Sequence, residues 1–133
     1  MRYQVLAAAG IAATARAAKP WLVYASGYGS NVRVFDIGAA ISAPCDAKPV
    51  KLEPLDQNND CGKNPSWLDI DAARNLLYCV YEDWDGAGGK LTPLRINEAD
   101  GKLKTLKAAP LATGPVHSVL FGDKNQSMIV SNL

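Results

Sequence analysis

Two side chains in this 133-residue sequence are candidates for moving protons in a reaction, His117 and Glu82. His117 is the only histidine, and an imidazole exchanges its proton near neutral pH. A carboxylate such as Glu82 can act as the base that activates a water molecule. Structural roles also account for both residues, because a histidine can be hydrogen-bonded at a strand start. A carboxylate can likewise cap a turn or pair with a lysine or arginine.

Three further residues, Asn64, Trp67 and Asn132, are candidate contacts for a substrate. Trp67 stands in one copy of an internal repeat where His117 stands in the next copy. Asn64 and Asn132 flank the same repeated segments, although asparagine is also a common turn-forming residue. These five side chains need a framework that brings them together, and the repeat supplies one.

The segments Asn64–Glu82 and Gly114–Leu133 resemble each other and can be aligned without a gap at a spacing of fifty residues. This alignment places Cys79 on Ile129. In both segments apolar residues alternate with other types, and a short polar turn divides each segment into halves. That pattern predicts a pair of antiparallel strands, a hairpin, in each copy.

The hairpins predict that four of the candidate residues share one end of the molecule. In an antiparallel pair, the start of the first strand and the end of the second lie at the same edge. Trp67 and His117 start first strands, whereas Glu82 and Asn132 end second strands. We therefore expect these side chains along one rim.

The earlier part of the chain belongs to the same series. Residues 22–37 match residues 76–96 when Tyr24 is placed on Tyr78 and five residues are inserted in the turn. Asp100-Gly101 marks a further hairpin. Four antiparallel strands repeated at 40–50 residues are typical of a β-propeller blade, whose inner strands line a central channel. The sequence therefore predicts an all-β fold over residues 19–133, with fewer than three four-stranded blades of a propeller.

Three cysteines are present, and two of them flank the first repeated strand. The strand reversal between Cys61 and Cys79 can bring this pair together as a disulfide, which leaves Cys45 unpaired. Cys79 also alternates with Leu77 and Tyr81, a pattern that fits a small buried residue equally well. The cysteines and the single histidine lack the spacing of a metal site, so no metal is expected.

Residues 1–18 have the layout of a secretory signal peptide: an early arginine, a short apolar run and small residues in an A-x-A pattern. An alanine-rich helix of the mature protein is the alternative, which Arg16 keeps open. We expect a secreted protein that begins at Lys19. In that compartment Asn125-Gln126-Ser127 is an acceptor sequence for a glycan at Asn125.

The formal charge of +1 and the scattered lysines and arginines give no electrostatic reason to expect nucleic acid or an anionic membrane surface as a partner. Glycine-rich stretches such as Gly86–Lys90 lack the remaining residues of a phosphate-binding loop. We therefore expect no cofactor.

The run "NDCGKNPSWLDIDAARNLLYCVYE" with the following "GKLTPLRINEADGKLKTLKAAPLATGPVHSVLF" resembles the lactonase family of seven-bladed β-propellers. That family includes 6-phosphogluconolactonases and carboxy-cis,cis-muconate cyclases, and the likeness is strongest to secreted fungal members. It covers nearly all of the chain after residue 18 but only about a third of a full family member. Tyr81-Glu82 departs from the Asp-Glu that many fungal members have at this point.

The resemblance implies an enzyme that hydrolyses or forms a small lactone, with a lactone or carboxylate as its substrate. Glu82 and His117 would then be catalytic, and Asn64, Trp67 and Asn132 would contact the substrate. Two alternatives stay open: a secreted propeller that binds glycan or protein without catalysis, and an inactive truncated product. A full-length protein is expected to be a monomer, and a truncated one to self-associate.

Overall fold

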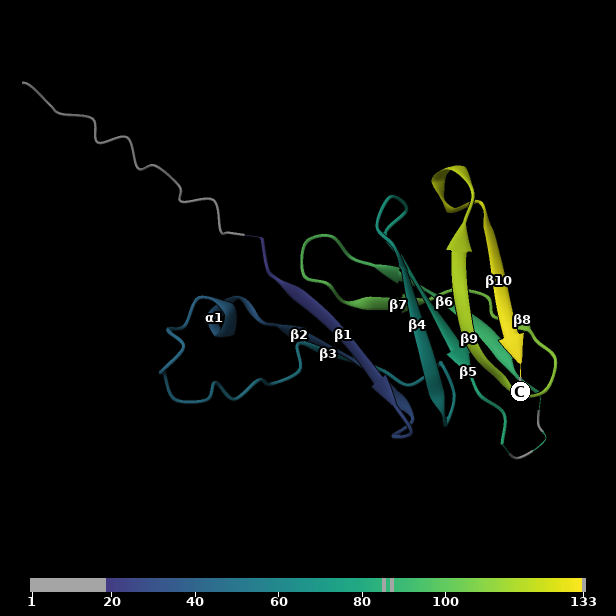
Figure 1. Ribbon diagram of the computed structural model, residues 1–133, viewed down its shortest axis with the longest axis horizontal. Helices are drawn as coiled ribbons and strands as arrows, with labels where there is room; N and C mark the ends of the chain where they lie inside the picture. Colours follow the sequence, from purple (N-terminus) through teal and green to yellow (C-terminus); the bar gives the residue numbers. More distant parts are fainter. Residues whose placement is uncertain (1–18, 85, 87, 133) are drawn as a thin grey trace, which may run out of the picture.

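The computed structural model describes residues 19–84, 86 and 88–132, which form three antiparallel sheets in succession along the chain (Figure 1). The predicted signal peptide, residues 1–18, lies outside the described residues. Almost all regular structure is β-strand, which confirms the predicted fold class. In the described part of the chain, no helix is long and apolar enough to cross a membrane.

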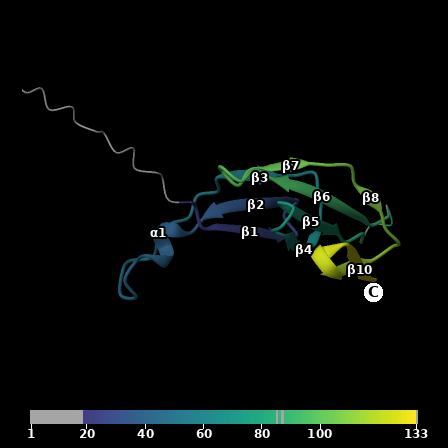
Figure 2. The same ribbon diagram turned by 90° about the horizontal axis from the view of Figure 1, so that it is seen from above.

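The first sheet has the order β1-β2-β3, formed by Leu22–Gly27, Asn31–Asp36 and Asp56–Asn58. A long connection between β2 and β3 carries α1, Gly38–Ile41, and extends away from the sheets (Figures 1 and 2). Residues 48–55 of this connection form no strand, and the third strand begins only at Asp56.

The second sheet is a complete blade in the order β4-β5-β6-β7, and β8 also pairs with β6. The fourth strand is therefore divided into two short pieces that share one partner. Gly101 has a positive φ of 75° at the β6–β7 hairpin, as the Asp-Gly pair predicted. The strands are Pro65–Asp71, Leu76–Tyr81, Lys90–Ile96, Leu103–Thr105 and Ala109–Pro110.

The third sheet contains β9, Pro115–Phe121, and β10, Ser127–Asn132, with the short 3₁₀ turn η1, Asp123–Asn125, between them. Figure 1 shows the three sheets following one another from β1 through β4 to β9 and β10. β4 and β5 lie against β9, and β1 lies against β4. Successive sheets therefore pack face to face, as blades do in a propeller.

The core lies between the first two sheets because alternate side chains of each sheet point into it. Val32 and Val34 of β2 are fully buried, whereas Arg33 between them is exposed. Tyr24 and Leu68 pack at the margin of this core. Its buried apolar residues are Val32, Cys61, Leu77, Cys79 and Leu94.

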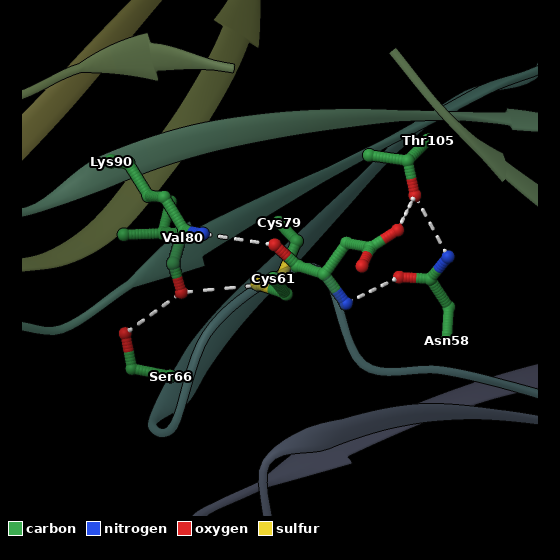
Figure 3. Close-up of a disulfide and its surroundings, with 8 residues drawn as sticks. Asn58, Cys61, Ser66, Cys79, Val80, Lys90 and Thr105 are labelled. Carbon is green, nitrogen blue, oxygen red and sulfur yellow. Dashed lines mark hydrogen bonds between the residues drawn. A yellow bond between two sulfur atoms is a disulfide. The ribbon is translucent and has the colours of Figure 1, made fainter. Parts of the chain in front are cut away.

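The predicted Cys61–Cys79 disulfide is present and crosses the core from the β3–β4 connection to β5 (Figure 3). The Cα atoms of the two cysteines are 6.0 Å apart, and both residues are fully buried. Beside the disulfide, Asn58 donates to the hydroxyl of Thr105 at 2.9 Å and so joins the outer strands of the first and second sheets. Cys45 is exposed and free, also as predicted.

The gap-free alignment of the repeat is wrong in its second half. Trp67 pairs with Val80 in the second sheet, whereas His117 pairs with Ser131 in the third, so β10 is displaced by 51 residues from β5. The reason is the turn, which has four residues after β4 and five after β9. Asn132 is therefore the equivalent of Tyr81 and not of Glu82.

Candidate functional site

Trp67 and His117 are positioned by the same irregularity in two sheets. The register shifts between Pro65 and Trp67 in β4, and between Pro115 and His117 in the β9–β10 pair. Each shift leaves one extra residue on the inner strand, which is a β-bulge. Bulges re-aim the side chains beside them and occur often next to functional sites. Both candidate residues directly follow such a bulge.

The two rings lie against each other across the boundary between the second and third sheets. Their centroids are 4.0 Å apart with an interplanar angle of 46°. Trp67 retains 38% of its surface exposed, and His117 is also exposed. The pair is therefore open to a ligand, and it presents an apolar ring surface next to an imidazole. The imidazole can exchange protons, whereas the indole can pack against a flat ligand.

Polar contacts along the same boundary hold the two inner strands in place. The hydroxyl of Ser118, which is buried, hydrogen-bonds the carboxylate of Asp69. The guanidinium of Arg74 donates to the buried carboxylate of Asp71 at 3.1 Å and to the carbonyl oxygen of Asn125 at 2.9 Å. These bonds fix β4 relative to the β9–β10 hairpin and so fix the position of the ring pair.

Glu82 lies at the end of β5 and has only 4% of its surface exposed. Its carboxylate accepts a hydrogen bond from the hydroxyl of Tyr28 at 3.0 Å, and its backbone N–H donates to the carbonyl oxygen of Asn64 at 3.0 Å. The bond to Glu82, with partial burial and the charge of Glu82 as smaller causes, raises the pKa of Tyr28 above 10. Glu82 thus tethers the β1–β2 turn to the second sheet.

The structure gives Glu82 and His117 different partners, Tyr28 for the carboxylate and Trp67 for the imidazole. Among the described residues no hydrogen bond joins the two predicted catalytic side chains. Asn64 contributes its carbonyl oxygen to the rim, and Asn132 is exposed at the end of β10, opposite Pro115. Their roles in binding a substrate stay predictions.

The sequence-based search missed Tyr28, which is separated from Glu82 by 54 residues. The match of the first two strands to residues 76–96 could have indicated this contact. It places the turn that carries Tyr28 and the turn that begins with Glu82 at the same rim. Asn125 lies in the β9–β10 turn and has a positive φ of 54°. The attachment of a glycan to Asn125 stays a prediction. Within the described ranges, no cluster of three or more histidine, cysteine, aspartate or glutamate residues could hold a metal ion.

Stacked antiparallel sheets with the strand order of blades define this chain as part of a β-propeller. Residues 19–132 match the family model described as lactonase, 7-bladed β-propeller. The chain therefore belongs to the lactonase family of seven-bladed β-propellers. Neither a curated protein nor a solved structure matches it.

Proposed function

We propose that the protein acts on a small lactone, either by hydrolysing it or by forming it from the open-chain hydroxy acid or carboxylate. The observation that carries this proposal is the exposed Trp67–His117 pair at the starts of two inner strands, in a chain of the lactonase family. The indole offers a surface for the flat lactone ring, and the imidazole lies beside it as the proton carrier.

In the hydrolytic direction, the oxygen of water forms a bond to the lactone carbonyl carbon while His117 accepts the proton that water loses. The ring carbon–oxygen bond then breaks, and His117 returns the proton to the departing ring oxygen. Lactone formation from a hydroxy acid is the reverse sequence: the hydroxyl of the open chain bonds to the carboxyl carbon and water leaves. Formation from an unsaturated carboxylate is instead an addition, in which the carboxylate oxygen bonds to one carbon of a double bond and His117 gives its proton to the other. One group, the imidazole of His117, therefore carries the proton in both steps.

Glu82 is the second proposed catalytic residue, as the carboxylate that orients or deprotonates water. Its burial and its bond to Tyr28 support a fixed position at the rim. Asn64, Trp67 and Asn132 are proposed to contact the substrate. The alternative, a non-catalytic propeller that binds glycan or protein, predicts that no lactone is turned over.

Turnover of a δ-lactone by the wild-type chain and by two variants tests this proposal. His117→Asn removes the proposed proton carrier and is expected to lower turnover at least about 100-fold. Glu82→Gln should also lower it, with a loss confined to kcat if the carboxylate acts in the reaction step. Arg33→Gln, on an exposed strand position, is the control and should leave turnover unchanged. Unchanged turnover in both His117→Asn and Glu82→Gln would show the assignment to be wrong.

Secretion is a separate proposal, supported by the layout of residues 1–18. N-terminal sequencing of the protein recovered from culture medium should begin at Lys19. Recovery of the protein only inside the cells, with Met1 or Arg2 at its start, would contradict it.

A further inference from the structure

A second exposed pair of aromatic rings lies at the rim, apart from Trp67 and His117. Tyr28 and Trp84 have 64% and 71% of their surface exposed, and their ring centroids are 5.6 Å apart at an interplanar angle of 55°. We name Tyr28 and Trp84 the rim pair. Two tilted rings at this separation leave π faces open to one small ligand.

One ring of the rim pair is held by a hydrogen bond and the other lies against it. The hydroxyl of Tyr28 is fixed on Glu82 at 3.0 Å. The indole of Trp84 packs on the ring of Tyr28, and the neighbouring Asp83 carboxylate accepts the N–H of Gly88 at 2.7 Å. A site whose rings are already in place loses little conformational entropy when a ligand binds.

The charge beside the rim pair is negative. Glu82 is 4% exposed, and the described residues give its carboxylate one side-chain partner, the neutral hydroxyl of Tyr28. A buried carboxylate without a cation is costly, so a positively charged ligand next to it would be stabilised. Arg33 alternates with the buried Val32 and Val34, so its side chain points away from the second sheet. It lines a hollow on the other face of the first sheet, which Tyr28 also borders. The negative charge therefore acts only on the side of Tyr28 that faces Glu82.

We propose that the rim pair, with Glu82 beside it, binds an organic cation of the quaternary or alkylated ammonium class. The methyl groups of such a cation would lie over the open faces of Tyr28 and Trp84, and its charge would face the carboxylate. Tilted aromatic rings with an adjacent acid are the arrangement that recognises this class of ligand. The chain already places one ammonium over a ring nearby, since the Nζ atom of Lys90 lies 5.7 Å from the ring centroid of Tyr81.

This proposal goes beyond lactone chemistry and is tested without any lactone. The full chain is titrated with choline, and the indole N–H signals of its three tryptophans are followed by NMR. The matched neutral probe is 3,3-dimethylbutan-1-ol, which replaces the ammonium nitrogen of choline with carbon. Saturable movement of the Trp84 signal is expected with choline, with at least about 10-fold weaker binding of the neutral alcohol.

Two variants locate the site. Trp84→Ala should weaken choline binding by about 3-fold to 30-fold, followed on a methyl signal of choline, because one π face is lost. Glu82→Gln keeps a hydrogen-bond acceptor for Tyr28 but removes the charge, and should weaken binding about 10-fold. Trp21→Ala removes another exposed tryptophan, one that lies outside the rim pair, and should leave binding unchanged. Because Trp84 is largely exposed, its removal leaves the fold intact, which the thermal unfolding midpoint checks.

Equal binding of choline and the neutral alcohol would overturn the proposal, since the rings would then form only an apolar patch. Saturable binding of methyl β-glucoside without binding of choline would assign the site to a sugar instead. Failure of choline to saturate any tryptophan signal at tens of millimolar would show that the pair binds no cation of this class.

Discussion

Removing the Cys61–Cys79 disulfide is expected to cost about 3 kcal/mol of the free energy of unfolding. The bridge closes a loop with a sequence separation of 18 residues. In the chain-entropy treatment, closing a loop of this length restricts the unfolded chain by about 11 cal/mol/K, which is about 3 kcal/mol at 25 °C. The double variant Cys61→Ala/Cys79→Ala should therefore unfold at a clearly lower urea concentration.

Urea unfolding followed by fluorescence measures this loss, and Cys45→Ala provides the matched control. Cys45 is exposed and free, so its removal should change stability by less than about 0.5 kcal/mol. The double variant should also unfold with a larger m-value, because an uncrosslinked chain exposes more surface. A loss below about 1 kcal/mol with an unchanged m-value would refute the reasoning, since the bridge would then not restrict the unfolded chain.

Three further predictions concern buried polar groups. Thr92→Val should raise the free energy of unfolding by about 1 kcal/mol in thermal or urea unfolding, because the hydroxyl of Thr92 is buried without a hydrogen-bond partner in the described structure. Arg74→Ala should cost about 2 kcal/mol, because it leaves the fully buried Asp71 carboxylate without its cation. The raised pKa of Tyr28 favours its neutral form in the folded state, so this contribution to stability is complete below pH 10 and is lost as the pH rises through the folded-state pKa. Absorbance at 295 nm should show one tyrosine titrating at lower pH in Glu82→Gln than in the wild-type protein.

The controls for these predictions separate the intended cause from general damage. Thr113→Val, at an exposed position, should leave stability unchanged, and a destabilising Thr92→Val would show that the hydroxyl is bonded. Asp71→Asn added to Arg74→Ala should recover part of the loss, because it removes the unpaired charge. Absence of any recovery would assign the loss to the arginine stem. An identical tyrosine titration in Glu82→Gln and in the wild-type protein would contradict the role of the carboxylate.

Much of the fold could be predicted from local pattern because strands and hairpins depend on neighbouring residues. Val32 and Val34 alternate with Arg33 in the sequence, and this local pattern agrees with the buried and exposed faces of β2. The match of Tyr24 to Tyr78 gave the correct register. Tyr24 pairs with Val34 in the neighbouring strand, and Tyr78 pairs with Pro93. The second pair is separated by five more residues of chain than the first, which agrees with the five inserted residues. The strand reversal between Cys61 and Cys79 made their disulfide one of two interpretations of the sequence, and the structure contains it.

The errors arose where one residue changes a turn or a strand. The extra residue in the β9–β10 turn is not visible in a repeat aligned on Pro65 and Pro115, because Asn75 and Asn125 still coincide and both adopt a positive φ. The bulges before Trp67 and His117 have no sequence signal in a single chain. Contacts between turns of different sheets, such as Tyr28 with Glu82, depend on how the sheets pack and cannot be derived from local alternation.

The most direct test of lactone binding at the Trp67–His117 pair uses the single histidine. Its imidazole gives one Hε1 proton signal, so this NMR signal is assigned without the spectrum of a variant. Gluconate, the stable open-chain product of a δ-lactone, is added to the full chain while this signal is followed. We expect the Hε1 signal of His117 to shift saturably, and we expect a smaller shift in Trp67→Ala. A signal that stays fixed at saturating gluconate and at saturating lactone would contradict the central claim.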